Sequence, residues 1–383
     1  MTSSSHYRRI AGFYFFYYAF VGLFSPYWSL YLKSINFDAI DIAVLMSIQP
    51  VMRMVAPSIW GWLADHTGKR QKVVQVAASL SALCYLGVFA TTSYWGMFLV
   101  LTLMGFFWSA SMPLVEATTL SYLGKNSAHY GRIRSWGSIG FIVSVVGLGY
   151  AFDYFAIAWL LWAGLGCEIG ILIFSRQLPK TEVLAHHTDS QPIIHIVLQR
   201  PVLALFIACF LMSVAHGSYY TFFSIYLVEH GYAKSVVGWL WAIGVICEIG
   251  VFFIMPWLVG RFGFVRILVF SFSAAVVRFL LIGWGVDVLV LLLFAQVLHA
   301  ATFGAYHASS VGLIHEYFKG RHQSKGQALF GSLTYGAGGM AGGLLSGPIW
   351  QHCGASVLYT VSAAAALLGL LLILWKSSMV HNS

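Results

Sequence analysis

Charged side chains are scarce in this sequence. Asp, Glu, Lys and Arg make up 9% of its 383 residues, whereas a soluble domain carries about 25%. Hydrophobic residues account for 59% and the mean hydropathy is +0.80. This composition excludes an ordinary soluble domain and predicts a membrane protein that crosses the bilayer many times.

Cysteines and catalytic signatures are equally sparse. Four of the five cysteines fall within long apolar runs, and no two form a CxxC pair, so neither a disulfide framework nor a metal site is predicted. The sequence has no HExxH, no GxSxG nucleophile elbow and no P-loop. We therefore expect neither an enzyme nor a sensor, and no cofactor or metal.

Apolar runs of ~20 residues, separated by turn and charge clusters, predict twelve transmembrane helices. The first run is too long for the hydrophobic core of a signal peptide, so we expect no cleavable signal. The predicted spans lie near residues 10–32, 41–62, 73–91, 95–122, 134–152, 155–176, 201–228, 235–258, 266–286, 288–315, 327–350 and 355–375.

The net charge of +9 reflects membrane topology. Most Lys and Arg residues lie at the start of the chain, in the even-numbered loops or in the tail, while the opposite side has only Lys33 and Lys234. Because basic loops stay in the cytoplasm, both termini are expected there. The distribution gives no reason to expect a nucleic-acid partner.

The two halves of the chain are similar at an offset of 195 residues. "GLFSPYWSLYLKSINFDAIDIAVLMSI" from Gly22 aligns without gaps with "GSYYTFFSIYLVEHGYAKSVVGWLWAI" from Gly217. Each half therefore holds six helices. The predicted domains are residues 1–176, a cytoplasmic linker at 177–200, and residues 201–383. Parallel halves with a site between them at the midplane are typical of major facilitator transporters.

The loop "GWLADHTGKRQK" (61–72) resembles the signature that the major facilitator superfamily carries between its second and third helices. The resemblance implies an all-α membrane protein with twelve transmembrane helices in two pseudo-symmetric six-helix halves. Glycines permit a tight turn, an acid can cap a helix N-terminus, and His66 stands where a fixed cation is usual. The residues expected to act in this conformational loop are Gly61, Asp65, Gly68, Lys69 and Arg70.

Glycine-rich runs occupy equivalent places in the two halves. They are "GSIGFIVSVVGLG" in the fifth span and "GSLTYGAGGMAGGLLSG" in the eleventh. Small residues let helices approach closely. We expect these runs to pack between the halves.

Ionisable side chains inside the predicted spans are the main functional signal, because a charge at the bilayer centre costs at least ~2.5–3.5 kcal/mol. Arg53 and Glu248 stand at equivalent positions of the repeat. Glu248, Arg278 and His299 lie at a similar depth in their helices, near the midplane. The deep titratable groups are Arg53, Glu168, His216, Glu248, Arg278, His299 and His307, with Glu116 and Arg134 nearer the cytoplasmic end.

Two spans carry polar or aromatic clusters near these groups. In the tenth span, His299, Thr302, Tyr306 and Ser310 share one face and are expected to line a path. His307 lies off that face and fits either a packed or a functional histidine, and Glu168 is expected to be structural. The seventh span has a cavity cluster of His216, Tyr219 and Tyr220. The first span has an aromatic stripe, which packing explains better than cargo binding: Phe13, Tyr17, Phe20, Phe24, Tyr27 and Tyr31.

Several segments resemble the 3-phenylpropionic acid permease family. They are "LHAATFGAYH", "AHGSYYTFFSIYL", "VGWLWAIGVICEIGVFF" and "MRMVAPS", and the family also has an arginine at the position of Arg53. The resemblance covers nearly the whole chain. It implies uptake of a small aromatic carboxylate across the bacterial inner membrane.

A wider resemblance is to lactose permease and the nucleoside:proton symporters. Glu116 and Arg134, eighteen residues apart in "PLVEAT" and "YGRIRSWGSIG", match the substrate-binding acid and arginine of lactose permease in type and spacing. Arg278 and His299 likewise match its coupling region. Thr302 stands where the proton-carrying glutamate would be, so a relocated carboxylate becomes the candidate proton carrier.

Two functions stay open on the sequence alone: a proton-coupled carrier of a small aromatic carboxylate, or a proton symporter of an oligosaccharide or nucleoside. We expect a monomer in the lipid bilayer whose partners are a small-molecule substrate and protons. Glu248 is expected to couple the proton, with His299 as the alternative. The residues expected to bind substrate are Arg53, Glu116, Arg134, His216, Tyr219, Tyr220, Arg278, His299 and Thr302.

Overall fold

The computed structural model describes residues 4–124, 129–179 and 193–381. Most of the predicted linker, residues 180–192, therefore lies outside the described residues. Within the described ranges the chain is helical and has no strand. It divides into two compact units: Met1–His187 with Ala233–Trp239, and Thr188–Tyr232 with Leu240–Ser383.

Twelve helices long enough to span a membrane are present in these ranges. Ten helical segments are long and apolar enough to cross a bilayer. One of them, α9 (Lys234–Trp284), is two helices that meet at Gly263, where φ is 73° and ψ is 162°, a conformation that glycine adopts most readily. The continuous run from α12 to α13, residues 323–353, gives the remaining helix. The predicted all-α fold with twelve spans is confirmed.

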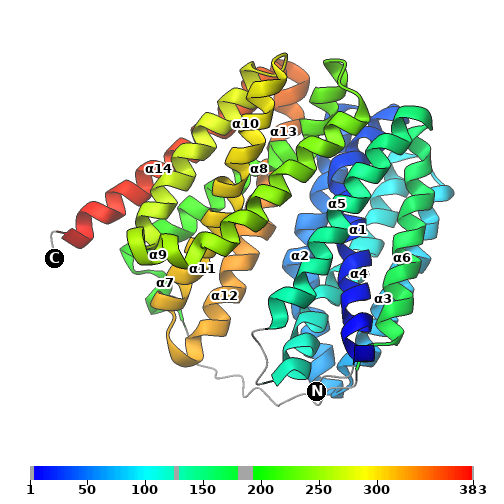
Figure 1. Ribbon diagram of the computed structural model, residues 1–383, viewed down its shortest axis with the longest axis horizontal. Coiled ribbons are helices and arrows are strands. Elements are labelled where there is room, and N and C mark those ends of the chain that lie inside the picture. The colour runs from blue at the N-terminus through cyan, green and yellow to red at the C-terminus, as the bar shows by residue number, and fades with distance from the viewer. Residues whose placement is uncertain (1–3, 125–128, 180–192, 382–383) are drawn as a thin grey trace. The chain divides into compact units, whose positions relative to one another are not determined.

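The first unit contains six helices, whose starts are set partly by side-chain caps. Asp38 accepts the Asp41 N–H at 2.8 Å before α2, and Ser93 accepts the Gly96 N–H at 3.2 Å before α4. In Figure 1, α1 lies against α5 and α6, while α2 and α3 pack on α4. The helices are α1 (Ser4–Ser34), α2 (Ala39–Thr67), α3 (Arg70–Tyr85), α4 (Tyr94–Leu123), α5 (Tyr130–Tyr154) and α6 (Leu160–Arg176).

The first turns of α9 also belong to this unit, because they rest on the end of α5. The Ser235 N–H donates to Asp153 Oδ1 at 3.3 Å, and the Trp239 indole donates to Tyr150 Oη at 3.1 Å. The helices touch through glycine: a Cβ on Gly238 would lie 2.6 Å from the carbonyl oxygen of Val145. No larger residue fits this crossing without a shift of the backbone.

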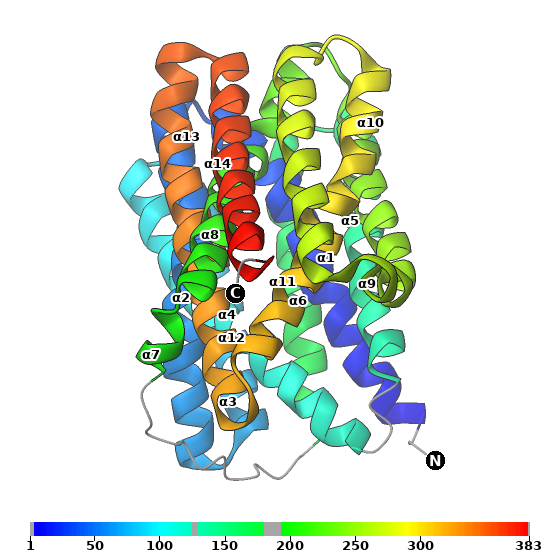
Figure 2. The ribbon, with the colours of Figure 1, turned by 90° about the vertical axis from the view of Figure 1, so that its left-hand side faces the viewer.

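The second unit is organised around α8 (Arg200–Glu229). Figure 2 shows α13 (Gly339–Cys353) and α14 (Ala355–His381) beside it, and both pack against it. A short helix, α7 (Ile194–Val197), precedes α8. Two π-helical segments interrupt the last helices: η4 (Ala300–Ala305) between α10 (Leu289–His299) and α11 (Tyr306–Tyr317), and η6 (Ser332–Gly338) between α12 (Gln323–Gly331) and α13. Segments of this kind occur often at functional sites.

The glycine-rich runs make close contacts inside the units. Gly140 of α5 lies against Phe15 of α1, and Gly342 of α13 lies against Val214 of α8. Each pair lies within one six-helix half, so at these two positions our expectation of packing between halves was wrong. Gly149, in the run of the fifth span, does meet the other half of the sequence, because an added Cβ there would lie 2.7 Å from the carbonyl oxygen of Lys234 in α9. The small side chains instead bring α1 onto α5 and α8 onto α13.

Candidate functional site

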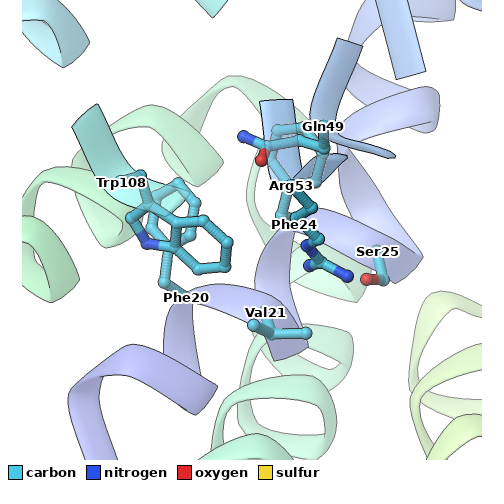
Figure 3. A pocket seen from close by; sticks show the side chains of 7 residues that line it. All are labelled: Phe20, Val21, Phe24, Ser25, Gln49, Arg53 and Trp108. Carbon is cyan, nitrogen blue, oxygen red and sulfur yellow. The ribbon is translucent and has the colours of Figure 1, made fainter. Parts of the chain in front are cut away.

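A recess in the first unit combines aromatic rings with polar groups. It has an empty volume of about 190 Å³ and is partly open. Helix α1 supplies two rings and a hydroxyl, α2 supplies an amide and a guanidinium, and α4 supplies an indole (Figure 3). Its walls are Phe20, Val21, Phe24, Ser25, Gln49, Arg53 and Trp108.

Arg53 brings an available positive charge to this recess. Its side chain is exposed, and its guanidinium carbon lies 5.6 Å from the centroid of the Trp108 ring. Among the residues that the structure describes it has no ion-pair partner within 4.0 Å. Trp108 is itself held by stacking on Tyr17, with the ring centroids 4.2 Å apart and the ring planes 12° from parallel.

Gln49 lies one helical turn before Arg53 and was not selected from the sequence. Its side chain is only 5% exposed, yet neither Nε2 nor Oε1 has a hydrogen-bond partner in the described part of the chain. A buried polar atom left unsatisfied costs about 1–3 kcal/mol. A polar residue inside the run "SIQPVMRM" was the available signal, but it was weaker than the charge of Arg53.

The aromatic stripe of α1 is buried throughout, as its packing interpretation predicted. Phe13 and Tyr27 are 0% exposed, and the remaining members are at most 7% exposed. Phe20 and Phe24 nevertheless form part of the recess wall. The same stripe therefore packs the helix and offers two rings to a ligand.

Glu116 and Arg134 are joined to neighbouring tyrosines and make no direct ion pair. The Tyr130 hydroxyl donates to Glu116 Oε1 at 3.2 Å, and Arg134 Nη2 donates to the Tyr18 hydroxyl at 2.5 Å. Arg134 also lies over the Tyr18 ring, 4.0 Å from its centroid. Both charged side chains are half-buried. The pair predicted from the sequence is close enough for an electrostatic interaction, but tyrosines complete its hydrogen bonds.

The predicted conformational loop forms a tight connection between α2 and α3. Gly68 ends α2 with φ of 63°, a left-handed cap that suits glycine. Thr67 Oγ1 donates to the carbonyl oxygen of Leu63 at 2.7 Å. Asp65 and Lys69 are exposed, and the N-cap position of α3 has no side-chain hydrogen bond. The capping role of Asp65 therefore stays a prediction.

In the second unit, several predicted residues gather around Arg278, which is 0% exposed. Its guanidinium carbon lies 4.2 Å from the centroid of the Tyr219 ring, and Nε donates to the carbonyl oxygen of Ala295 at 3.1 Å. The Tyr219 hydroxyl donates to Gln296 at 2.9 Å. His299 stacks on Tyr219 with centroids 5.8 Å apart. Tyr220 and Thr302 border the same cluster.

Hydrogen bonding fixes the protonation of His216. Arg278 Nη1 lies 3.3 Å from His216 Nε2, and because a guanidinium only donates, Nε2 must accept. The ring proton is then on Nδ1, which lies 2.8 Å from the carbonyl oxygen of Met212. His216 is therefore neutral here and orients the guanidinium.

Arg278 has no counter-ion in the described residues. No carboxylate lies within 4.0 Å of it, and Nη2 has no hydrogen-bond partner. Burying an ion costs several kcal/mol, which the ring of Tyr219 offsets only in part. A cation left in this state attracts any negative group that can approach it.

Glu248 is half-buried in the first part of α9, beside the π-helical segment η4. A Cβ on Gly304 would lie 3.0 Å from Glu248 Cγ. One turn earlier, Gly244 lies against His299 in the same way, at 3.1 Å from Cδ2. Glu248 thus lies against Gly304, one turn of α9 from the contact between Gly244 and His299, and its role in proton coupling stays a prediction.

The polar stripe of the tenth span faces a helix and not an open path. Tyr306 and Ser310 are 2% and 0% exposed, and both contact Cys209 of α8, at 3.2 Å and 3.5 Å. The π-helical segment changes the register between His299 and Tyr306, so the 3.6-residue spacing used for the prediction does not hold. His307 hydrogen-bonds through Nδ1 to the Tyr335 hydroxyl at 2.7 Å.

Glu168 is completely buried between α3 and α6, apart from the recess. The Ser81 hydroxyl donates to its Oε1 at 3.2 Å, and Oε2 has no partner in the described chain. No residue of the two groups described above contacts it. This agrees with leaving Glu168 out of the candidate site.

Comparison with known proteins identifies the family of this fold. The model of the MFS_1 like family matches residues 7–361. The chain belongs to the MFS_1 like family. It is therefore a secondary transporter of the major facilitator type, a multi-pass membrane protein and not an enzyme.

The relatives differ in the substrates that their names give. The chain is 27% identical to a probable 3-phenylpropionic acid transporter of Escherichia coli (strain K12), over 94% of this chain and 95% of the relative. It is 26% identical to a maltose permease of Geobacillus stearothermophilus, over 94% and 92%. A crystal structure of the nucleoside transporter NupG superimposes with a TM-score of 0.84 at 16% identity, over 97% of this chain and 98% of that chain. The last likeness shows the fold alone.

Proposed function

We propose that the chain is a proton-coupled uptake carrier for a small aromatic carboxylate such as 3-phenylpropionate. The observation that supports this most is the recess of the first unit, where the unpaired guanidinium of Arg53 lies beside Trp108. A guanidinium binds a carboxylate through charge-assisted hydrogen bonds. The surrounding rings of Phe20, Phe24 and Trp108 offer stacking contacts to an aromatic ring.

A carrier of a neutral polar solute, an oligosaccharide or a nucleoside, is the second candidate. Glu116 and Arg134 favour it, because both are half-buried and held by tyrosine hydroxyls, ready to hydrogen-bond a substrate hydroxyl. The maltose permease and nucleoside permease relatives point in the same direction. Under this alternative Arg53 would pack against Trp108 or help to orient α2 in the membrane, and it would not bind substrate.

Uptake into proteoliposomes separates these candidates. The purified protein is reconstituted, a proton gradient is imposed or omitted, and 3-phenylpropionate, uridine and maltose are tested at equal concentration. We expect accumulation of 3-phenylpropionate only, and only with the gradient. Accumulation of uridine or maltose instead would support the second candidate, and gradient-independent equilibration of 3-phenylpropionate would contradict proton coupling.

Glu248 is proposed as the proton-coupling carboxylate, with Arg278 and His299 as partners. It is half-buried near His299 and in the same unit as the uncompensated Arg278. An ionised Glu248 would be attracted to that cation and a protonated one would not, so protonation can change the contacts of α9. Orientation in the bacterial inner membrane with cytoplasmic termini, and a monomeric state, belong to the same proposal and rest on the basic loops and the family.

The substitution Glu248→Gln tests the coupling role. We expect it to abolish gradient-driven accumulation and to spare counterflow exchange, because exchange needs no net proton movement. Glu316→Gln is a matched control, since it makes the same substitution at an exposed carboxylate of α11. Retained accumulation in Glu248→Gln would exclude Glu248 and move the role to His299.

A further inference from the structure

The buried amide of Gln49 makes no hydrogen bond within the described residues. It is 5% exposed, both of its polar atoms lack partners in the described residues, and it belongs to a helix that crosses the bilayer. Lipid offers no hydrogen bonds, so polar groups inside a span are retained for function or are paired. An orphaned buried amide therefore calls for a partner outside the protein chain.

Gln49 packs closely against a glycine of α4. Gly105 of α4 stands opposite, and an added Cβ there would lie 3.4 Å from Gln49 Nε2 and 3.2 Å from Met52 Cγ. Trp108, one turn further along α4, is part of the recess. A glycine at this place keeps the amide from being covered by a side chain of α4.

Gln49 and Arg53 offer two polar groups that point in different directions. In Figure 3 the amide is turned toward the side of Trp108, while the guanidinium is turned toward Ser25. Residues four apart on a helix have Cβ atoms about 5–6 Å from each other. A substrate lying along α2 with its carboxylate at Arg53 would therefore bring its ring, and not its acid group, to Gln49.

We propose that Gln49 is a specificity-determining residue that hydrogen-bonds a hydroxyl on the substrate ring, so that the preferred substrates are hydroxylated single-ring aromatic carboxylates. This inference rests on the proposed function, because it assumes that an aromatic acid occupies the recess. A phenolic hydroxyl can donate to Oε1 or accept from Nε2. The contact is therefore possible whichever way round the amide is turned.

The transporter should discriminate between hydroxylated and unsubstituted acids because only the hydroxylated acids can hydrogen-bond the Gln49 amide. 3-Phenylpropionate bound at Arg53 leaves the Gln49 amide without a partner, whereas a ring hydroxyl satisfies one of its atoms. Sites built to hydrogen-bond a hydroxyl reject analogues that lack it. We expect a preference of roughly tenfold for the hydroxylated acid.

The test compares half-saturation concentrations for uptake of 3-(4-hydroxyphenyl)propionate, its 3-hydroxyphenyl isomer and 3-phenylpropionate in proteoliposomes. The wild type should prefer at least one hydroxylated acid by roughly tenfold. Gln49→Met, similar in length but without hydrogen-bonding groups, should take up all three about equally. Gln75→Met is the matched control: Gln75 is a half-buried glutamine of α3 that donates to the carbonyl oxygen of Arg176, outside the recess, so the preference should remain.

Each result bears on one of the two proposals. Equal uptake of all three acids by the wild type would overturn the role of Gln49 and leave the proposed function standing. A preference that persists in Gln49→Met would do the same. Uptake of none of the acids, with uptake of uridine or maltose, would overturn the proposed function together with this inference. Where Gln49→Met does not fold, Gln49→Leu replaces it, because only a folded variant without the amide assigns a wild-type preference to Gln49.

Discussion

Replacing Arg53 by glutamine separates substrate binding from stability. The side chain is exposed, and its guanidinium carbon lies 5.6 Å from the centroid of the Trp108 ring. A cation–π contact at an exposed site contributes about 0.5–1 kcal/mol. Arg53→Gln should therefore lower the free energy of unfolding by no more than about 1 kcal/mol, and the melting temperature in detergent should change little.

The expected effect on substrate binding is larger. A hydrogen bond to a charged group contributes about 1.5–3 kcal/mol, which corresponds to roughly 10- to 150-fold in affinity. The half-saturation concentration for 3-phenylpropionate should rise by that factor in Arg53→Gln. Arg53→Lys keeps the charge but loses the planar pair of donors, so it should fall between the wild type and the glutamine variant.

The assay measures uptake of 3-phenylpropionate over a range of concentrations, with 3-phenylpropanol as a neutral competitor. The alcohol fills the recess without a charge, so its inhibition constant should be similar in the wild type and in Arg53→Gln. Unchanged affinity for the acid in Arg53→Gln would refute the role of the guanidinium. An equal loss for the acid and the alcohol would show that Arg53 acts on the shape of the recess and not on the charge of the substrate.

Three further predictions follow from other parts of the chain. Gly238→Ala should lower thermal stability and transport, because its Cβ would lie 2.6 Å from the carbonyl oxygen of Val145, whereas Gly250→Ala, where nothing lies within 4 Å, should be neutral or slightly stabilising in the same melting assay. Glu116→Gln and Arg134→Lys should each reduce the affinity or rate of uptake by roughly tenfold; unchanged kinetics in both would exclude the pair from binding and from gating. Cysteines introduced into residues 177–198 should react with a membrane-impermeant thiol reagent only in inside-out vesicles, and labelling in intact cells would reverse the predicted topology.

Most of the fold could be predicted because its signals are local. Apolar runs and turn residues placed the fourth span at 95–122, and α4 extends over Tyr94–Leu123. The gap between the predicted spans 235–258 and 266–286 contains Gly263, where the helix breaks. The π-helical segments were not predictable in this way, because one extra residue per turn leaves no mark in the hydrophobic pattern. They changed which face of the tenth span carries its polar residues.

The candidate site was predicted in part. A sequence shows which residues are charged, but it does not show which side chains are buried or which hydrogen bonds they make. Arg53, Arg278 and Glu248 were found as ionisable residues inside apolar runs. Gln49 was missed, since an uncharged polar residue in a span is common and only the structure shows that its amide is buried without a partner. Phe20 and Phe24 illustrate the same limit, because their burial and their place in the recess wall depend on α2 and α4.

Arg53 and Arg278 show how burial assigns different roles to the same residue type. Arg53 is exposed beside an aromatic recess, so a ligand can reach its charge. Arg278 is 0% exposed and already donates to Ala295 and His216, so its charge acts through space on its own unit. An uncompensated cation in a low-dielectric interior favours ionised carboxylates nearby. The first arginine is therefore suited to hold the substrate, and the second, after the break of α9 at Gly263, to attract an ionised Glu248 before that break.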